Sequence, residues 1–234
     1  MTAPVNLNMS RILALETTEK NATVAAWEEN HLLMELQPEG RSAQTLAPAI
    51  RELFGHLGWK SRDVQAVAVG IGPGSFTGLR VGIMTAKMFA YATGAKVIGI
   101  DTLEALAAAT GNETQKISVA VDAQRNEVVA QNFEIDDDNL PIPLGPQRMI
   151  PIDEWWSFGS EAGANVTFSG PILHRIEKRV PEGIVLEARA LWNPQATHIG
   201  KIAATRLERG EFDDLWTLLP RYSRPSAAEE RTEK

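Results

Sequence analysis

The sequence contains no cysteine among its 234 residues. A chain without thiols has no disulfide scaffold, no thiolate nucleophile, no iron–sulfur cluster and no cysteine-ligated zinc. No stretch approaches the roughly 20 apolar residues of a membrane-spanning helix. The first residues, MTAPVNLNMSR, also lack an apolar run typical of a signal peptide. The absence of cysteine does not fix the compartment, but the absence of a signal peptide and of a membrane span predicts a cytoplasmic, soluble protein.

The chain has only four histidines, and its 30 acidic residues outnumber its 23 lysines and arginines. No two of the four histidines lie within one helical turn, so a His-x-x-x-His metal pair is absent. The sequence also shows no pairing of a serine with a histidine that would indicate a catalytic triad with a serine nucleophile. The net charge is −7, and an acidic surface disfavours broad binding to phosphate backbones. We therefore predict no catalytic residue, no metal and no cofactor.

Apolar runs of strand and helix length are what the sequence does contain, and their order repeats. The order βββαβα occurs twice, which predicts an α/β fold of two ribonuclease-H-like lobes around a cleft, as in actin, sugar kinases and the Hsp70 ATPase. In the first half we expect strands at 11–15, 22–28, 31–36, 64–70 and 96–100, and helices at about 45–57, 77–92 and 102–110. In the second half we expect strands at 117–123, 126–135, 147–150 and 165–170, a solvated loop at 136–146, and helices after Pro151, at 171–179 and at 194–210.

This pattern also predicts the domain organisation. The segments are a flexible leader at 1–9, an N-terminal lobe at 10–110, a divergent C-terminal lobe at 111–219 and a tail at 220–234. Helix 194–210 is expected to pack back onto the first lobe. The tail is charged and lacks apolar periodicity, which is typical of a flexible or partner-contacting segment.

A glycine-rich stretch, V-G-I-G-P-G-S-F-T-G-L-R, occupies residues 69–80, where a strand turns into a helix. No Gly-Lys-Ser/Thr follows it, so it is not a P-loop. One interpretation is a tight turn with Ser75 or Thr77 capping the helix. The other is a vestigial anion site formed by Gly72, Gly74, Ser75 and Arg80 at the start of the helix. Because a cation in the first turn opposes the helix dipole, Arg80 predicts a carboxylate or phosphate nearby.

Two acidic residues end the first strand of each half. Glu16, followed by Thr17, lies where cleft kinases place an Asp and a Gly beneath the ATP phosphates, and Asp122 is its counterpart. The two carboxylates are candidates to face each other across the cleft and hold magnesium, and a hydrogen-bonded structural role is the alternative. Neither turn has a glycine to let the backbone approach phosphate, so we predict weak or absent nucleotide binding.

Helix 77–92 is apolar nearly all round, which indicates burial on more than one side. Its small residues recur every four positions, and Val81, Met84, Met88 and Tyr91 form another face. We predict that this helix and helix 45–57 form a partner interface through Leu46, Ile50, Leu53, Gly78, Gly82, Ala86 and Ala90. The alternative is that the small residues pack on the sheet of their own lobe.

Four motifs together resemble the TsaB (YeaZ) family. They are I-L-A-L-E-T-T at 12–18, V-G-I-G-P-G-S-F-T-G-L-R-V-G at 69–82, V-D-A-Q-R-N-E-V at 121–128 and P-R-Y-S-R-P at 220–225. The match is close over about 10–103 and 117–130, although Gln124 and Asn126 stand where family members often have Arg and Gly. The resemblance implies a two-lobed actin-like fold, and it marks Tyr222 and Arg224 as tail contacts.

The family resemblance also implies a role. It implies a non-catalytic subunit of the bacterial complex that makes threonylcarbamoyladenosine next to the anticodon of tRNAs reading codons that begin with A. Such a subunit pairs through helices with a catalytic TsaD-like subunit, is assisted by a TsaE-like ATPase and meets tRNA through the complex. Pairing with a second copy when the partner is absent is left open. The alternative is an active enzyme, either a kinase with an actin-like fold or a metallopeptidase.

Overall fold

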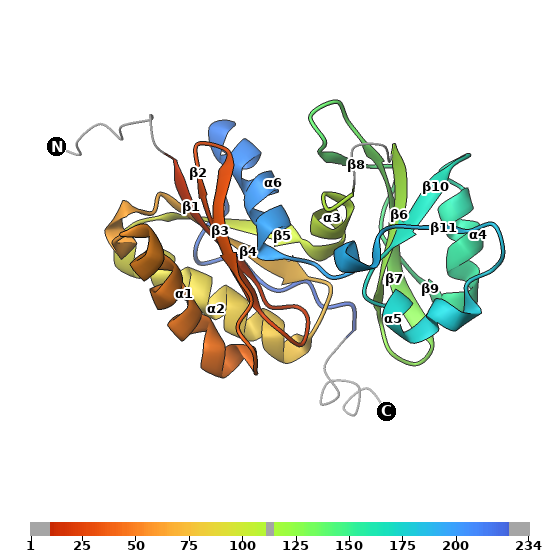
Figure 1. The fold of residues 1–234 in the computed structure, drawn as a ribbon, viewed down its shortest axis with the longest axis horizontal. Helices are drawn as coiled ribbons and strands as arrows, with labels where there is room; N and C mark the ends of the chain where they lie inside the picture. Colours follow the sequence, from red (N-terminus) through yellow and green to blue (C-terminus); the bar gives the residue numbers. More distant parts are fainter. Residues whose placement is uncertain (1–9, 111–114, 225–234) are drawn as a thin grey trace.

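Two β-sheets with the same strand order form the framework of the protein (Figure 1). The computed structural model describes residues 10–110 and 115–224. The first sheet has the order β3-β2-β1-β4-β5 and comprises β1 (Arg11–Glu16), β2 (Thr23–Glu28), β3 (His31–Leu36), β4 (Ala66–Gly72) and β5 (Lys96–Asp101). The second has the order β11-β10-β6-β7-β8 and comprises β6 (Lys116–Asp122), β7 (Glu127–Ile135), β8 (Pro141–Pro143), β10 (Val166–Ser169) and β11 (Val185–Leu186), with β9 (Arg148–Pro151) also beside β7.

The pairing directions confirm the duplicated fold. In the first sheet, β1 pairs antiparallel with β2 and parallel with β4. In the second sheet, β6 likewise pairs antiparallel with β7 and parallel with β10. The protein therefore has the predicted α/β architecture of two ribonuclease-H-like units.

Helices cover both faces of each sheet, and two of them lie between the sheets (Figure 1). α1 (Ser42–Leu57) and α2 (Phe76–Thr93) pack on the outer face of the first sheet, and α4 (Trp155–Ser160) and α5 (Leu173–Ile176) on that of the second. α3 (Thr102–Ala107) and α6 (Ala196–Glu208) occupy the space between the sheets. Although α6 follows the second sheet in sequence, it packs on β1, β2 and β4 of the first. None of the helices in the described part of the chain is long and apolar enough to cross a membrane.

Burial on both faces explains why the strands read as continuous apolar runs. Side chains alternate across a strand, so Leu13 and Leu15 face α1 and α2 while Ile12 and Ala14 face α6. All four side chains are at most 1% exposed. The first sheet is thus the middle layer of a three-layer lobe.

The structure corrects two predicted elements. α1 begins at Ser42 rather than near Thr45, which places Pro48 inside the helix. Pro48 and Gln44 are both exposed, so water can bind the Gln44 carbonyl that lacks an N–H partner at Pro48. Residues 141–143, predicted as loop, form β8 at a sheet edge, where proline is tolerated.

The first residues of the predicted flexible tail are held against the folded chain. The Arg221 N–H donates to the Ile71 carbonyl (2.7 Å), and the Arg224 side chain donates to the Ala123 carbonyl (2.8 Å). The prediction of a flexible tail is therefore wrong for residues 220–224. The predicted leader, 1–9, and the rest of the tail, 225–234, lie outside the described residues.

Candidate functional site

The glycine-rich loop before α2 fits closely around the turn that follows β1. A Cβ on Gly78 would lie 1.9 Å from the Thr17 carbonyl oxygen, and one on Gly82 would lie 2.2 Å from Thr17 Oγ1. A Cβ on Gly74 would lie 2.4 Å from Thr18 Cβ. Real Cβ atoms do not approach other atoms so closely, so these glycines are required for packing. The spaces they leave are filled by protein rather than by a phosphate.

Hydrogen bonds hold the same turn to the start of α2. Thr17 Oγ1 donates to the Gly78 carbonyl (2.8 Å), and the Ser75 N–H donates to the Thr18 carbonyl (2.8 Å). Ser75 caps the helix, because its Oγ accepts from the Gly78 N–H (3.2 Å). Gly72 is covered as well, since a Cβ there would lie 2.4 Å from the Arg221 carbonyl oxygen. The tight-turn interpretation of residues 69–80 therefore fits the geometry, and the anion site does not.

Glu16 is enclosed within its own lobe. It is 1% exposed, and its Oε1 accepts the Thr18 N–H at 2.5 Å. Burial in low dielectric raises the pKa of this carboxyl group above its ordinary value. Thr17 is 0% exposed. Of the two alternatives for Glu16, magnesium binding opposite Asp122 does not fit, because Glu16 and Thr17 point into the packed lobe; the hydrogen-bonded structural role fits.

The cleft between the lobes is a mixed-charge hollow of about 300 Å³. Its lining comprises Thr18, Glu19, Lys20, Gly74, Ser75, Val121, Asp122, Pro171, Ile172, His174 and Arg175. Asp122 pairs with Arg175 at 2.8 Å. Burial, together with Glu16 and Asp122, raises the pKa of Glu19 to about 7. Among residues 10–110 and 115–224, no three His, Asp or Glu side chains are grouped to hold a metal ion.

Arg80 meets aromatic rings and a hydroxyl group rather than the predicted carboxylate or phosphate. Its guanidinium lies 4.0 Å from the centroid of the Phe76 ring, and its Nε donates to the Tyr222 hydroxyl (3.0 Å). Tyr222 stacks on Phe76 with ring centroids 4.5 Å apart. The aromatic faces attract the cation and offset its unfavourable position in the first turn of α2. Of the predicted tail contacts, Tyr222 thus packs on α2 and Arg224 on the second lobe of its own chain.

The predicted interface residues are mostly inside the protein. Ala86 is 0% and Ala90 3% exposed, and Gly78 and Gly82 are buried against the turn after β1. On α1, Leu46 and Leu53 are in the core, and Ile50 is half-buried. The small-residue stripe therefore packs on its own lobe, and its assignment to a partner is wrong because the turn after β1 and the core of the first lobe already cover that face.

The opposite face of α2 is exposed and apolar. Met84, Met88 and Tyr91 are 55%, 67% and 71% exposed. Beside it, a groove of about 820 Å³ between α1 and α2 is lined by Ala47, Ile50, Arg51, Phe54, Gly55, Gly58, Trp59, Lys60, Ser61, Thr85, Met88 and Phe89. On the other side, Trp216 is 71% exposed and packs edge-on against Tyr91, with ring centroids 5.9 Å apart. Contiguous exposed apolar surface of this kind marks interaction sites.

Comparison with known proteins places this arrangement in a family. The family model described as "TsaD: tRNA N6-adenosine threonylcarbamoyltransferase" matches residues 39–229. The chain is 32% identical to the "tRNA threonylcarbamoyladenosine biosynthesis protein TsaB" of Escherichia coli over 134 residues, which cover 56% of this chain and 58% of that protein. It is 25% identical to the Bacillus subtilis protein of the same name over 225 residues, which cover 93% and 96%.

A solved structure agrees over nearly the whole chain. YeaZ from Pseudomonas aeruginosa superposes with a TM-score of 0.80 at 27% identity, covering 92% of this chain and 100% of that one. The family match spans most of the chain, and the structural match includes both lobes. The chain therefore belongs to the TsaD family, and its relatives include the TsaB (YeaZ) proteins.

Proposed function

We propose that this chain is a non-catalytic subunit in the biosynthesis of threonylcarbamoyladenosine in tRNA, and that it pairs with and supports a catalytic TsaD-like subunit. The names of its relatives support the pathway, and its match to the TsaD family supports a related chain as partner. The match covers 58% of the length of the E. coli relative. A role for this chain in the activity of the whole assembly is therefore part of the proposal.

The observation that carries the proposal is the filled phosphate site. In a nucleotide-binding lobe, glycines free backbone N–H groups to cradle phosphate. Here Gly74, Gly78 and Gly82 instead accommodate Thr17 and Thr18. Glycines that are covered by their own chain offer no backbone cradle for a phosphate, which favours a supporting role over the alternative of an active kinase.

The partner surface that we propose is the exposed face of α2 with the groove beside α1. This surface, made by Met84, Met88, Tyr91 and the groove, is here called the α2 face. Exposed methionines form adaptable apolar contacts, and two helices offer ridges and grooves for a helical partner. Because the same surface is free in every copy, a homodimer of this chain would compete with the TsaD-like partner.

Met88→Glu tests this surface. The side chain is 67% exposed, so the substitution should leave the melting temperature nearly unchanged. Burying a new carboxylate in the complex should weaken association with a TsaD-like chain by 1 to 2 orders of magnitude, roughly 1–3 kcal/mol. Light scattering of the mixture and calorimetric titration measure this association.

Met149→Glu is the matched control. Met149 is 42% exposed on β9 of the second lobe, away from the α2 face, and its substitution should leave association intact. In cells that depend on this chain, Met88→Glu should lower the threonylcarbamoyladenosine content of tRNA, measured by mass spectrometry of nucleosides. Normal association and normal tRNA content in the Met88→Glu variant would reject the α2 face.

A further inference from the structure

The last described part of the chain, residues 213–224, runs from the first sheet to the second lobe; it is here called the clasp. It begins beside β5, the edge strand of the first sheet. The Asp213 N–H donates to the Val97 carbonyl (2.9 Å), and Asp213 Oδ2 accepts the Gly99 N–H (2.7 Å). These contacts cover backbone groups that an edge strand otherwise leaves exposed. The clasp is thus fixed to the first lobe at its start.

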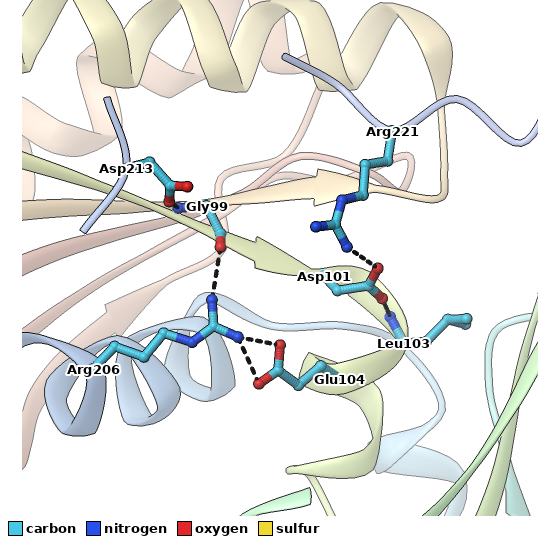
Figure 2. A network of polar contacts seen from close by, with 7 residues as sticks. All are labelled: Gly99, Asp101, Leu103, Glu104, Arg206, Asp213 and Arg221. Carbon is cyan, nitrogen blue, oxygen red and sulfur yellow. Dashed lines mark hydrogen bonds and ion pairs between the residues drawn. The ribbon is translucent and has the colours of Figure 1, made fainter. Parts of the chain in front are cut away.

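At the junction of β5 and α3 the chain leaves the first sheet and continues toward the second. Side chains from the C-terminal part of the chain form hydrogen bonds and ion pairs with this junction (Figure 2). Arg206 on α6 donates to the Gly99 carbonyl (3.0 Å) and to both carboxylate oxygens of Glu104 (2.9 and 2.7 Å). Asp101 caps α3 by accepting the Leu103 N–H (2.8 Å). Such forked arginine contacts fix orientation as well as distance.

The clasp adds its own arginine to this connection. Arg221 Nη1 lies 3.3 Å from the second oxygen of Asp101, as Figure 2 shows, and the Arg221 N–H donates to the Ile71 carbonyl. Gly72 leaves room for the Arg221 carbonyl, because a Cβ there would lie 2.4 Å away. Arg221 therefore connects Ile71 and Asp101, which lie at the ends of β4 and β5.

Three residues later the clasp reaches the second lobe. Arg224 Nε donates to the Ala123 carbonyl (2.8 Å), and its Nη2 pairs with Glu127. Ala123 lies in the turn between β6 and β7, and Glu127 is the first residue of β7. This turn is tight, since Gln124, Arg125 and Asn126 all have φ between 52° and 63°. A short segment anchored on both lobes restricts their relative motion.

The clasp also contacts α2, and its Trp216 packs edge-on against Tyr91 of the α2 face. Lys87 Nζ donates to the carbonyls of Trp216 and Leu218 (both 3.2 Å), and Arg80 donates to the Tyr222 hydroxyl. Trp216 and Leu219 are 71% and 69% exposed and extend the apolar surface of that face. A partner that covers the α2 face would therefore touch the segment that ties the lobes.

We propose that residues 213–224 fix the angle between the two lobes and couple it to occupancy of the α2 face. The first half of this proposal, that the clasp fixes the angle, concerns the lone chain. The second half, that the angle is coupled to occupancy of the α2 face, rests on the proposed function, because it requires a partner on that face. A ligand shifts a conformational equilibrium only by binding one arrangement better than another, and contact with the clasp supplies that difference.

Spin-label distances between the lobes test the first half. The chain has no cysteine, so Glu52→Cys on α1 and Ser157→Cys on α4, both exposed positions, give two unique labelling sites. Double electron–electron resonance on the lone chain should give a narrow distance distribution. The distribution should broaden in Arg224→Ala and broaden further in the pair Arg221→Ala with Arg224→Ala. Arg224→Lys, which keeps the charge without the forked contact, should be intermediate.

Arg189→Ala is the matched control, because Arg189 pairs with Glu177 within the second lobe and should leave the distribution unchanged. If the distance distribution does not broaden in folded Arg224→Ala, the clasp does not fix the angle between the lobes, whether or not the double variant folds.

Adding a TsaD-like chain tests the second half of the proposal. Binding should narrow the distance distribution of Arg224→Ala, and measured binding without narrowing overturns the coupling. Failure to bind would count against the proposed function and leaves the lone-chain result standing.

Discussion

The two faces of α2 differ in side-chain size and in what surrounds them. Gly78, Gly82, Ala86 and Ala90 form one face, which is buried against the lobe, while Met84, Met88 and Tyr91 form the other and are at least 55% exposed. The glycines of the small face permit close approach of Thr17, whose carbonyl group faces Gly78 and whose side chain faces Gly82. A stripe of small residues thus indicates that something comes close without saying whether it is the same chain or another.

The largest effect is expected from adding a methyl group to the small face. Gly78→Ala places a Cβ 1.9 Å from the Thr17 carbonyl oxygen, so α2 or the turn must move. We expect a loss of about 3 kcal/mol in the free energy of unfolding, the upper part of the usual range for overpacking. Urea denaturation measures the loss.

Gly55→Ala is the control for this substitution. Gly55 lies inside α1, and a Cβ there would have no atom within 4 Å. The same chemical change should therefore stabilise the protein by about 0.5–1 kcal/mol, because alanine is the better helix former. Equal effects of the two substitutions would contradict the account of Gly78.

Tryptophan on either face separates packing from partner contact. Ala86 is 0% exposed, so Ala86→Trp should destabilise the lone chain by roughly 1–3 kcal/mol. Met84 is 55% exposed two residues earlier, and Met84→Trp should stay within about 0.5 kcal/mol of the parent. Thermal unfolding of both variants, without a partner, measures the difference. A stable Ala86→Trp variant would contradict the burial of the small face against its own lobe.

The fold was predictable from sequence because it depends on local periodicity. The apolar runs at 11–15 and 31–36 and the stripe of the 77–92 helix carry their structure in their spacing. The short strands escaped prediction, since β8 has three residues, two of them proline, and β11 has two. Such strands are defined by pairing with β7 and β10 rather than by their own pattern.

The sites were harder to predict because each depends on a contact distant in sequence. The role of Gly78 requires Thr17, and the surroundings of Arg80 require Tyr222, 142 residues away. The exposed face of α2 had a visible signal in the spacing of Met84, Met88 and Tyr91. That signal predicts that the helix has a second apolar face. Only the tertiary structure shows which of the two faces is exposed to solvent.

The smallest expected effect concerns Glu19, at the end of the turn on which the small face of α2 rests. Burial is the first cause that raises its pKa to about 7, followed by the charges of Glu16 and Asp122. Between about pH 4.5 and 7 the unfolded chain has lost this proton while the folded chain retains it. The unfolded state then binds fewer protons, so the free energy of unfolding falls as pH rises through that window.

Glu19→Gln should remove this part of the pH dependence, because the amide does not titrate. The difference in unfolding free energy between pH 5 and pH 8 should shrink by about 1 kcal/mol, allowing for the water that reaches the carboxyl group. Urea denaturation at both pH values measures the difference, and Glu52→Gln, at an exposed position on α1, should retain the parent's dependence. An undiminished difference in Glu19→Gln would mean that Glu19 is ionised in the folded protein, with the turn beneath α2 open to solvent.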